Sequence, residues 1–213
     1  MSRLLNKKKQ VVREIVKRLK NEYPNSKCSL VYDSPFQLLV ATILSAQCTD
    51  ERVNKVTEKI FPKYPDAKSF SSLSEKQIGK LIFSTGFYNN KAKNIKKMSD
   101  IVCGNYNGEI PAEIEELVLL PGVGRKTANV VLGNVFDVPS MVVDTHVTRI
   151  SNLLKLVTTK NAVVIEKKLC EIVEKKDWSI LSHLFIDHGR KVCIANRPKC
   201  KDCILLDLCP SSK

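Results

Sequence analysis

Several features that define other protein classes are missing from this 213-residue sequence. No apolar run approaches the length of a membrane span, and the lysine-rich start lacks the apolar stretch and cleavage site of a secretory signal. Glycine is scarce, at 8 residues, and neither an internal repeat nor the phosphate loop G-x-x-x-x-G-K-[ST] occurs. Few segments alternate polar and apolar residues as strands do. The sequence therefore predicts an all-α protein inside the cell, with no membrane partner.

Acidic residues are also in short supply. Lysine and arginine number 35 against 22 aspartates and glutamates, which gives a formal net charge of +13. Such an excess favours a polyanionic partner, and nucleic acid is the commonest one. A generic basic protein with a lysine bias would carry the same charge, so charge alone leaves both readings open.

The eight cysteines are unevenly distributed. Four are scattered through the chain, and four crowd near its end. A disulfide-stapled secreted protein would spread its cysteines more widely. This distribution instead favours reduced thiols and one metal site in an intracellular protein.

Local signals predict about ten short helices. A cap residue followed by proline at Ser34-Pro35 is typical of a helix start. Asp50 is predicted to cap the next helix, and Ser72 with Glu75 fits a capping box. A further helix is predicted over 91–103, where nearly all charges are lysine, so one face should be strongly positive.

The central motif is a glycine turn that leads directly into a helix. Gly122 and Gly124 precede Arg125, Lys126 and Thr127, and an apolar-periodic segment follows. Glycines permit backbone angles that other residues avoid, and a helix start offers N–H groups and a positive dipole end to a phosphate. An ordinary turn between two helices would look the same when taken alone.

The last four cysteines, Cys193, Cys200, Cys203 and Cys209, form a C-x6-C-x2-C-x5-C array. Four thiolates within 17 residues can close around one metal centre. Zinc is the general alternative, but it typically uses paired C-x2–4-C knuckles, and this array has one such pair. The spacing favours a 4Fe–4S cluster over zinc, with disulfides a distant third.

Three motifs in this order resemble the endonuclease III family: the glycine turn with Arg125-Lys126, V-D-T-H-V at 143–147, and the cysteine array. The resemblance runs from S-P-F-Q-L-L-V-A-T-I-L-S-A-Q at Ser34 through Cys209. This family contains bifunctional DNA glycosylase/AP lyases of the helix-hairpin-helix superfamily. The resemblance implies removal of oxidised pyrimidines and cleavage 3′ to the abasic site, with a 4Fe–4S cluster as cofactor.

The resemblance also implies two helical domains with DNA bound in a cleft between them. A helical bundle would span residues 27–139, with the helix-hairpin-helix near 112–133. The other domain would combine residues 1–26 and 140–213 and carry the cluster loop 193–209.

Carried over residue by residue, Lys126 is the expected catalytic nucleophile and Asp144 the catalytic carboxylate. The lysine amine would attack the sugar, form a Schiff base and promote β-elimination. It must be neutral to do so, and a helix start, partial burial and Arg125 would all favour the neutral form. Taken alone, Lys126 reads as a solvated helix lysine and Asp144 as a plain N-cap.

An enzyme that extrudes a base must fill the gap left behind. Gln47 matches the family's gap-filling residue, and Phe87 lies where bacterial relatives often have a leucine wedge. Cys48, directly after Gln47, is a further small departure from the family's pattern. The full set of expected DNA contacts is Gln47, Phe87, Gly122, Val123, Gly124, Arg125, Thr127, His146, Arg197 and Lys199.

The expected partner is double-stranded DNA with damaged pyrimidines or abasic sites, bound by a monomer, in the cytoplasm or nucleoid if the source is bacterial. Two other readings remain. The related adenine mismatch glycosylase lacks the lysine nucleophile and normally has an extra recognition domain. A non-catalytic iron–sulfur DNA-binding or redox-sensing protein would have no use for Lys126 together with Asp144.

Overall fold

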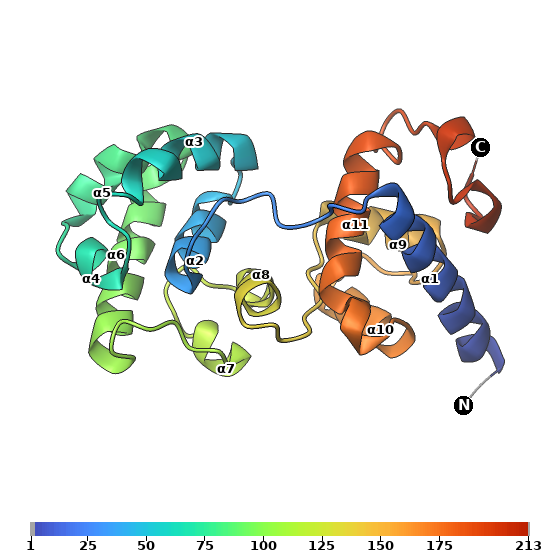
Figure 1. The fold of residues 1–213 in the computed structure, drawn as a ribbon, viewed down its shortest axis with the longest axis horizontal. Coiled ribbons are helices and arrows are strands. Elements are labelled where there is room, and N and C mark those ends of the chain that lie inside the picture. The colour runs from blue at the N-terminus through green and yellow to red at the C-terminus, as the bar shows by residue number, and fades with distance from the viewer. Residues whose placement is uncertain (1–2, 213) are drawn as a thin grey trace. The chain divides into compact units, whose positions relative to one another are not determined.

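A computed structural model describes the backbone of residues 3–212 and the side chains of residues 5–212. Within these residues every regular element is helical and no strand occurs (Figure 1), as predicted. No helix in this range is long and apolar enough to cross a membrane. The α-helices are α1 (Arg3–Glu22), α2 (Pro35–Leu44), α3 (Asp50–Ile60), α4 (Ala67–Ser71), α5 (Glu75–Ile82), α6 (Tyr88–Asn105), α7 (Ile114–Leu117), α8 (Arg125–Val135), α9 (Thr145–Leu153), α10 (Ala162–Ile172) and α11 (Trp178–Lys191).

The chain divides into two units, each with its own apolar core. The bundle unit is continuous and runs from Cys28 to Val138. The cysteine unit joins the N-terminal segment through Lys27 to the segment from Pro139 onward. Residues 1, 2 and 213, which fall in the predicted N/C-terminal domain, lie outside the described residues.

Helix α2 lies at the centre of the bundle unit, where it packs against α3, α6 and α8. It starts as the sequence predicts, because the Ser34 hydroxyl accepts the Gln37 N–H at 3.2 Å and Pro35 occupies the first turn. Nearly every residue of α2 is buried. The helix is therefore a fixed support for the polar loop that follows it.

Other helix starts differ from the sequence prediction by one or two residues. Thr49, rather than Asp50, caps α3, and its side chain accepts the Arg52 N–H. The capping box of α5 is Ser74 with Gln77, not Ser72 with Glu75. Adjacent hydroxyl and carboxylate residues offer competing caps, and packing of the helix selects one of them.

Helix α6 is less positive than its sequence suggests. It begins at Tyr88, and Ile95, Met98 and Val102 on its inner face are buried. Lys91 shares that buried face, with only 6% of its surface exposed. Lys96 is paired with Asp100 at 2.6 Å. The strongly basic face predicted for residues 91–103 is therefore reduced.

In the cysteine unit, α1 packs against α10 and α11, and α9 packs against α11. Gly189 of α11 permits the close approach of α9, since a Cβ atom there would collide with Nδ1 of His146. Ile15 and Leu19 of α1 are fully buried with Leu181 and Phe185 of α11. The first helix of the chain thus completes a core built mainly by the last third.

Candidate active site and cysteine centre

The glycine hairpin, residues 118–124, connects α7 to α8 in the bundle unit. Leu120 and Val123 are buried beneath it, and the Val123 N–H donates to the Leu120 carbonyl at 3.0 Å. Gly122 has φ +81°, and a Cβ atom there would lie 2.9 Å from Cβ of Asn94. Gly124 has φ −93°, with open space around a Cβ position. Only Gly122 is therefore required by the turn itself, and Gly124 leaves the backbone accessible from outside.

Helix α8 begins directly after the hairpin. Gly124 is its N-cap and has no side chain, so the helix lacks a side-chain cap bond from this residue. Lys126 lies in the first turn and is exposed, whereas Thr127 is half-buried. The partial burial expected for Lys126 is not found, because the helix start projects away from the core of its unit. An accessible amine stands at the positive end of a helix dipole.

Asp144 caps the start of α9 in the cysteine unit. Its Oδ1 accepts the Val147 N–H at 2.8 Å, and the side chain is half-buried. This bond fixes the carboxylate and engages one of its two oxygens. His146, the second residue of α9, is half-buried, and its Nδ1 lies 3.1 Å from Nη2 of Arg149.

Gln47 and Phe87 lie on two loops of the bundle unit and share an unusual backbone. Gln47 has φ +55° and Phe87 has φ +49°. Both are exposed, and 65% of the Phe87 surface faces solvent. A left-handed backbone at a non-glycine residue costs about 1–3 kcal/mol. It also occurs at Asn107, Asp137 and Lys155, so this backbone alone does not mark a functional site. An aromatic residue at a turn could instead be buried in the core, but the exposure of Phe87 excludes that role.

Cys193, Cys200, Cys203 and Cys209 all line one cavity of about 320 Å³ in the cysteine unit. None forms a disulfide. Burial raises the pKa of Cys193 and of Cys203 above the usual thiol value. Within residues 3–212, no three histidine, cysteine or acidic side chains are close enough to hold a single metal ion. The four cysteines are thus gathered around one space.

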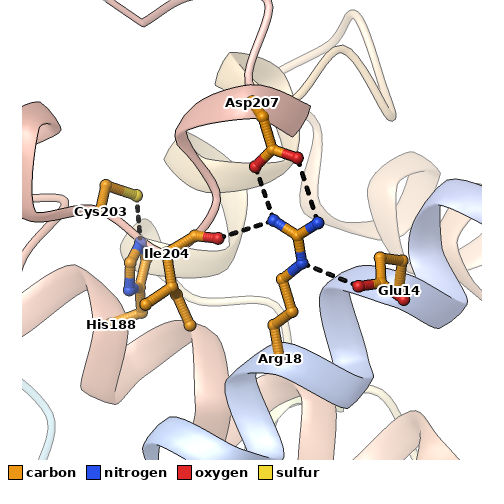
Figure 2. Close-up of polar contacts among 6 residues, drawn as sticks. All are labelled: Glu14, Arg18, His188, Cys203, Ile204 and Asp207. Carbon is orange, nitrogen blue, oxygen red and sulfur yellow. Dashed lines mark hydrogen bonds and ion pairs between the residues drawn. The ribbon is translucent and has the colours of Figure 1, made fainter.

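Arg18 of α1 ties down the cysteine loop, residues 193–209 (Figure 2). Its guanidinium donates to the Ile204 carbonyl at 2.9 Å and to both carboxylate oxygens of Asp207. Nearby, Nε2 of His188 lies 3.5 Å from Sγ of Cys203, and Nδ1 of the same ring lies 3.1 Å from the Tyr23 hydroxyl. The segment between Cys203 and Cys209 is thus held from outside by α1.

Arg149 of α9 holds the other end of the loop. Its Nη2 donates to the carbonyls of Cys193 at 2.7 Å and Gly189 at 3.2 Å, and its charge partly offsets the raised pKa of the Cys193 thiol. Arg197 and Lys199 are exposed on the same loop. Sequence reasoning missed both Arg18 and Arg149, since their roles depend on contacts between distant segments.

A family model described as the HhH-GPD superfamily of base excision DNA repair proteins matches residues 40–175. The endonuclease III of Synechocystis is 49% identical, over 100% of this chain and 99% of the relative. The chain belongs to the endonuclease III family. It is therefore a base excision DNA repair protein of the helix-hairpin-helix type.

Solved structures of endonuclease III agree with this assignment. A non-covalent endonuclease III–DNA complex superimposes with a TM-score of 0.91, at 43% identity, over 96% of both chains. A trapped covalent endonuclease III–DNA intermediate superimposes with a TM-score of 0.90, again at 43% identity and 96% coverage of both chains. The match to endonuclease III therefore includes both units.

Proposed function

We propose that this endonuclease III family member is a bifunctional DNA glycosylase/AP lyase that removes oxidised pyrimidines and cleaves 3′ to the abasic site. The observation that carries the proposal is the position of Lys126. The lysine that matches the family motif is exposed in the first turn of α8, directly beside the open backbone of Gly124. An amine in this place can reach a sugar while the hairpin backbone holds the adjacent phosphate.

Lys126 acts as the nucleophile. Its neutral amine attacks C1′ of the damaged nucleotide, the C1′–N bond breaks, and the base departs with the bonding electrons. Ring opening gives a Schiff base between Nζ and C1′, which acidifies the C2′ proton. Loss of that proton expels the 3′ phosphate, so the strand is cut by β-elimination, and water then releases the sugar from Lys126.

Asp144 assists this chemistry as a carboxylate. Oδ1 is engaged by the Val147 N–H, which fixes the orientation of the group. Oδ2 stabilises the positive charge that develops on the sugar and takes part in the proton transfers. Capping and catalysis are compatible, because they use different oxygens.

The four cysteines of the cysteine loop fit a 4Fe–4S cluster. The fit rests on the cavity that all four share and on the C-x6-C-x2-C-x5-C spacing. When bound, the cluster supplies four iron–thiolate bonds that fix the loop. Arg197 and Lys199, exposed on this loop, then contact the DNA backbone.

The partner is duplex DNA that contains damaged pyrimidines or abasic sites, bound by a monomer inside the cell. Gly122, Val123, Gly124, Arg125 and Thr127 bind the backbone at the hairpin. Gln47 fills the gap left by the extruded nucleotide, and Phe87 wedges between bases. His146 lines the pocket.

Borohydride trapping on a duplex with one abasic site tests the proposal. Reduction of the Schiff base should link the protein covalently to DNA, and Lys126→Gln should abolish the adduct while retaining binding. Lys80→Gln, an exposed lysine on α5, is the matched control and should form the adduct normally. An undiminished adduct in Lys126→Gln would disprove the lysine assignment. Binding without an adduct or strand cleavage in the parent protein would favour the non-catalytic alternative.

A further inference from the structure

Lys91 is a buried cation whose partners all lie next to the proposed gap-filling and wedge residues. Its Nζ donates to the Leu44 carbonyl and to the Thr85 carbonyl, each at 2.8 Å. Its backbone N–H donates to the Phe87 carbonyl at 3.2 Å, which is an ordinary helical bond of the first turn of α6. The Lys91 side chain therefore bonds the end of α2, which precedes Gln47, and the turn that carries Phe87. Figure 1 shows α2 and α6 side by side.

The Leu44 carbonyl is available because of the Gln47 backbone. In a continued helix, the Cys48 N–H would donate to Leu44. The chain turns left-handed at Gln47, and this N–H donates to Ser45 instead, at 3.1 Å. Leu44 is thus a terminal helix carbonyl at the negative end of the α2 dipole, where a cation is favoured.

The Thr85 carbonyl is in a similar position. Thr85 ends a 3-10 turn, Phe83–Thr85, and the next two residues, Gly86 and Phe87, both have positive φ, at +69° and +49°. No helix or strand pairing continues through these residues. Burial lowers the pKa of Lys91, and a buried lysine is retained in a core only where its donors are used.

We infer that Lys91 is a positioning residue that holds the Gln47 loop (residues 45–48) and the Phe87 turn (residues 83–87) in the geometry needed to enter duplex DNA. This inference rests on the proposed function. Lys91 does not touch the substrate in this role. It links two strained loops from beneath, so that the gap-filling residue and the wedge keep a fixed spacing before DNA arrives.

Lys91→Met tests the inference, because it keeps the length of the side chain and removes the ammonium. The matched control is Lys97→Met, which removes the same charge from an exposed position on α6. The first readout is the fluorescence of 2-aminopurine placed opposite an abasic site analogue in a duplex. Entry of Gln47 and Phe87 unstacks this base and raises its fluorescence. Lys91→Met should lose most of the rise, and Lys97→Met should retain it.

The second readout separates positioning from general damage. A single-stranded abasic oligonucleotide has no opposite strand to wedge, so borohydride trapping on it should change less than about twofold in Lys91→Met. Excision from a duplex should fall by about tenfold or more, since small misplacements are known to cost up to about 10²-fold. Equal losses on both substrates would mean a purely structural role and would overturn the inference.

If Lys91→Met does not fold, Lys91→Gln keeps an uncharged amide with two N–H donors on a shorter side chain and should show a smaller duplex-specific loss. If it shows none, the inference fails. A parent protein that forms no adduct refutes the proposed function. If the parent protein and Lys91→Met excise equally well from a duplex, only the role of Lys91 is refuted.

Discussion

The glycine hairpin and the cysteine loop are both short irregular segments, but they are held in different ways. The hairpin is fixed by its own residues, through buried Leu120 and Val123 and the φ of +81° at Gly122. The cysteine loop surrounds a cavity and is held by Arg18 and Arg149 from helices far away in the sequence. The hairpin can therefore form without a bound group, whereas under the proposed function the cysteine loop is also held by the cluster in its cavity.

The largest expected effect is the loss of a cluster ligand. Cys203→Ala should yield colourless protein with a free energy of unfolding lower by on the order of 4–5 kcal/mol, because loss of a metal centre is among the most destabilising changes. Thermal unfolding should show a Tm lower by roughly 10–20 °C. Cys103→Ala, in α6 of the bundle unit, is the control and should stay yellow-brown. Equal stability of the two variants, or an active protein that holds zinc alone, would contradict the cluster.

A smaller effect is expected at the hairpin, where the two glycines should behave differently. Gly122→Ala should reduce stability by about 1–3 kcal/mol, because it combines a left-handed backbone with a contact to Asn94. Gly124→Ala should change stability by less than about 0.5 kcal/mol but weaken DNA binding, since the new methyl group crowds the phosphate approach. Denaturant unfolding and DNA titration measure the two effects. Unchanged DNA affinity in Gly124→Ala would exclude this backbone contact.

The smallest effect is expected for the contacts of Arg18 with Asp207 and the Ile204 carbonyl, which hold the cysteine loop from outside. Arg18→Met should speed the bleaching of the cluster by a chelator and lower Tm only slightly, since the ion pair with Asp207 is exposed. Asp207→Asn should act alike, and the double variant should add little. The pKa of Asp207 is lowered in the folded protein, so the contribution of the pair persists above the usual carboxyl pKa and is lost in stronger acid. Arg13→Met is the control. Arg13 also lies on α1 but pairs with Glu174, and its loss should leave the rate of bleaching unchanged.

The sequence was informative wherever local chemistry decides the structure. Ser34-Pro35 and Asp144 each predicted a helix start, and both starts are present. The family resemblance named the catalytic and cysteine residues, whose roles remain proposals. Thr49 could not be distinguished from Asp50 as a cap, because both residue types are suitable and the packing of α3 makes the choice.

Roles that depend on distant contacts could not be predicted. In the sequence, Arg149 looks like any arginine on a helix. Its contacts with the Gly189 and Cys193 carbonyls exist only because α9 and α11 approach closely at Gly189. Lys91 did carry a signal, since it is spaced four residues before Ile95 and seven before Met98, on the buried face of α6. The expectation that a charged residue faces solvent concealed this periodicity.

The division of the chain into its two units has a consequence for synthesis on the ribosome. Helix α1 emerges before the bundle unit, yet its apolar face packs against α10 and α11, which emerge after that unit. The bundle unit is continuous and can fold in the interval, as domains generally do during translation. Until α10 and α11 have been synthesised, α1 exposes Val12, Ile15 and Leu19 without their partners, and Arg18 cannot reach Asp207. Docking of α1 is therefore a late step. Arg18 can bind Asp207 on the cysteine loop only after all four cysteines have been synthesised.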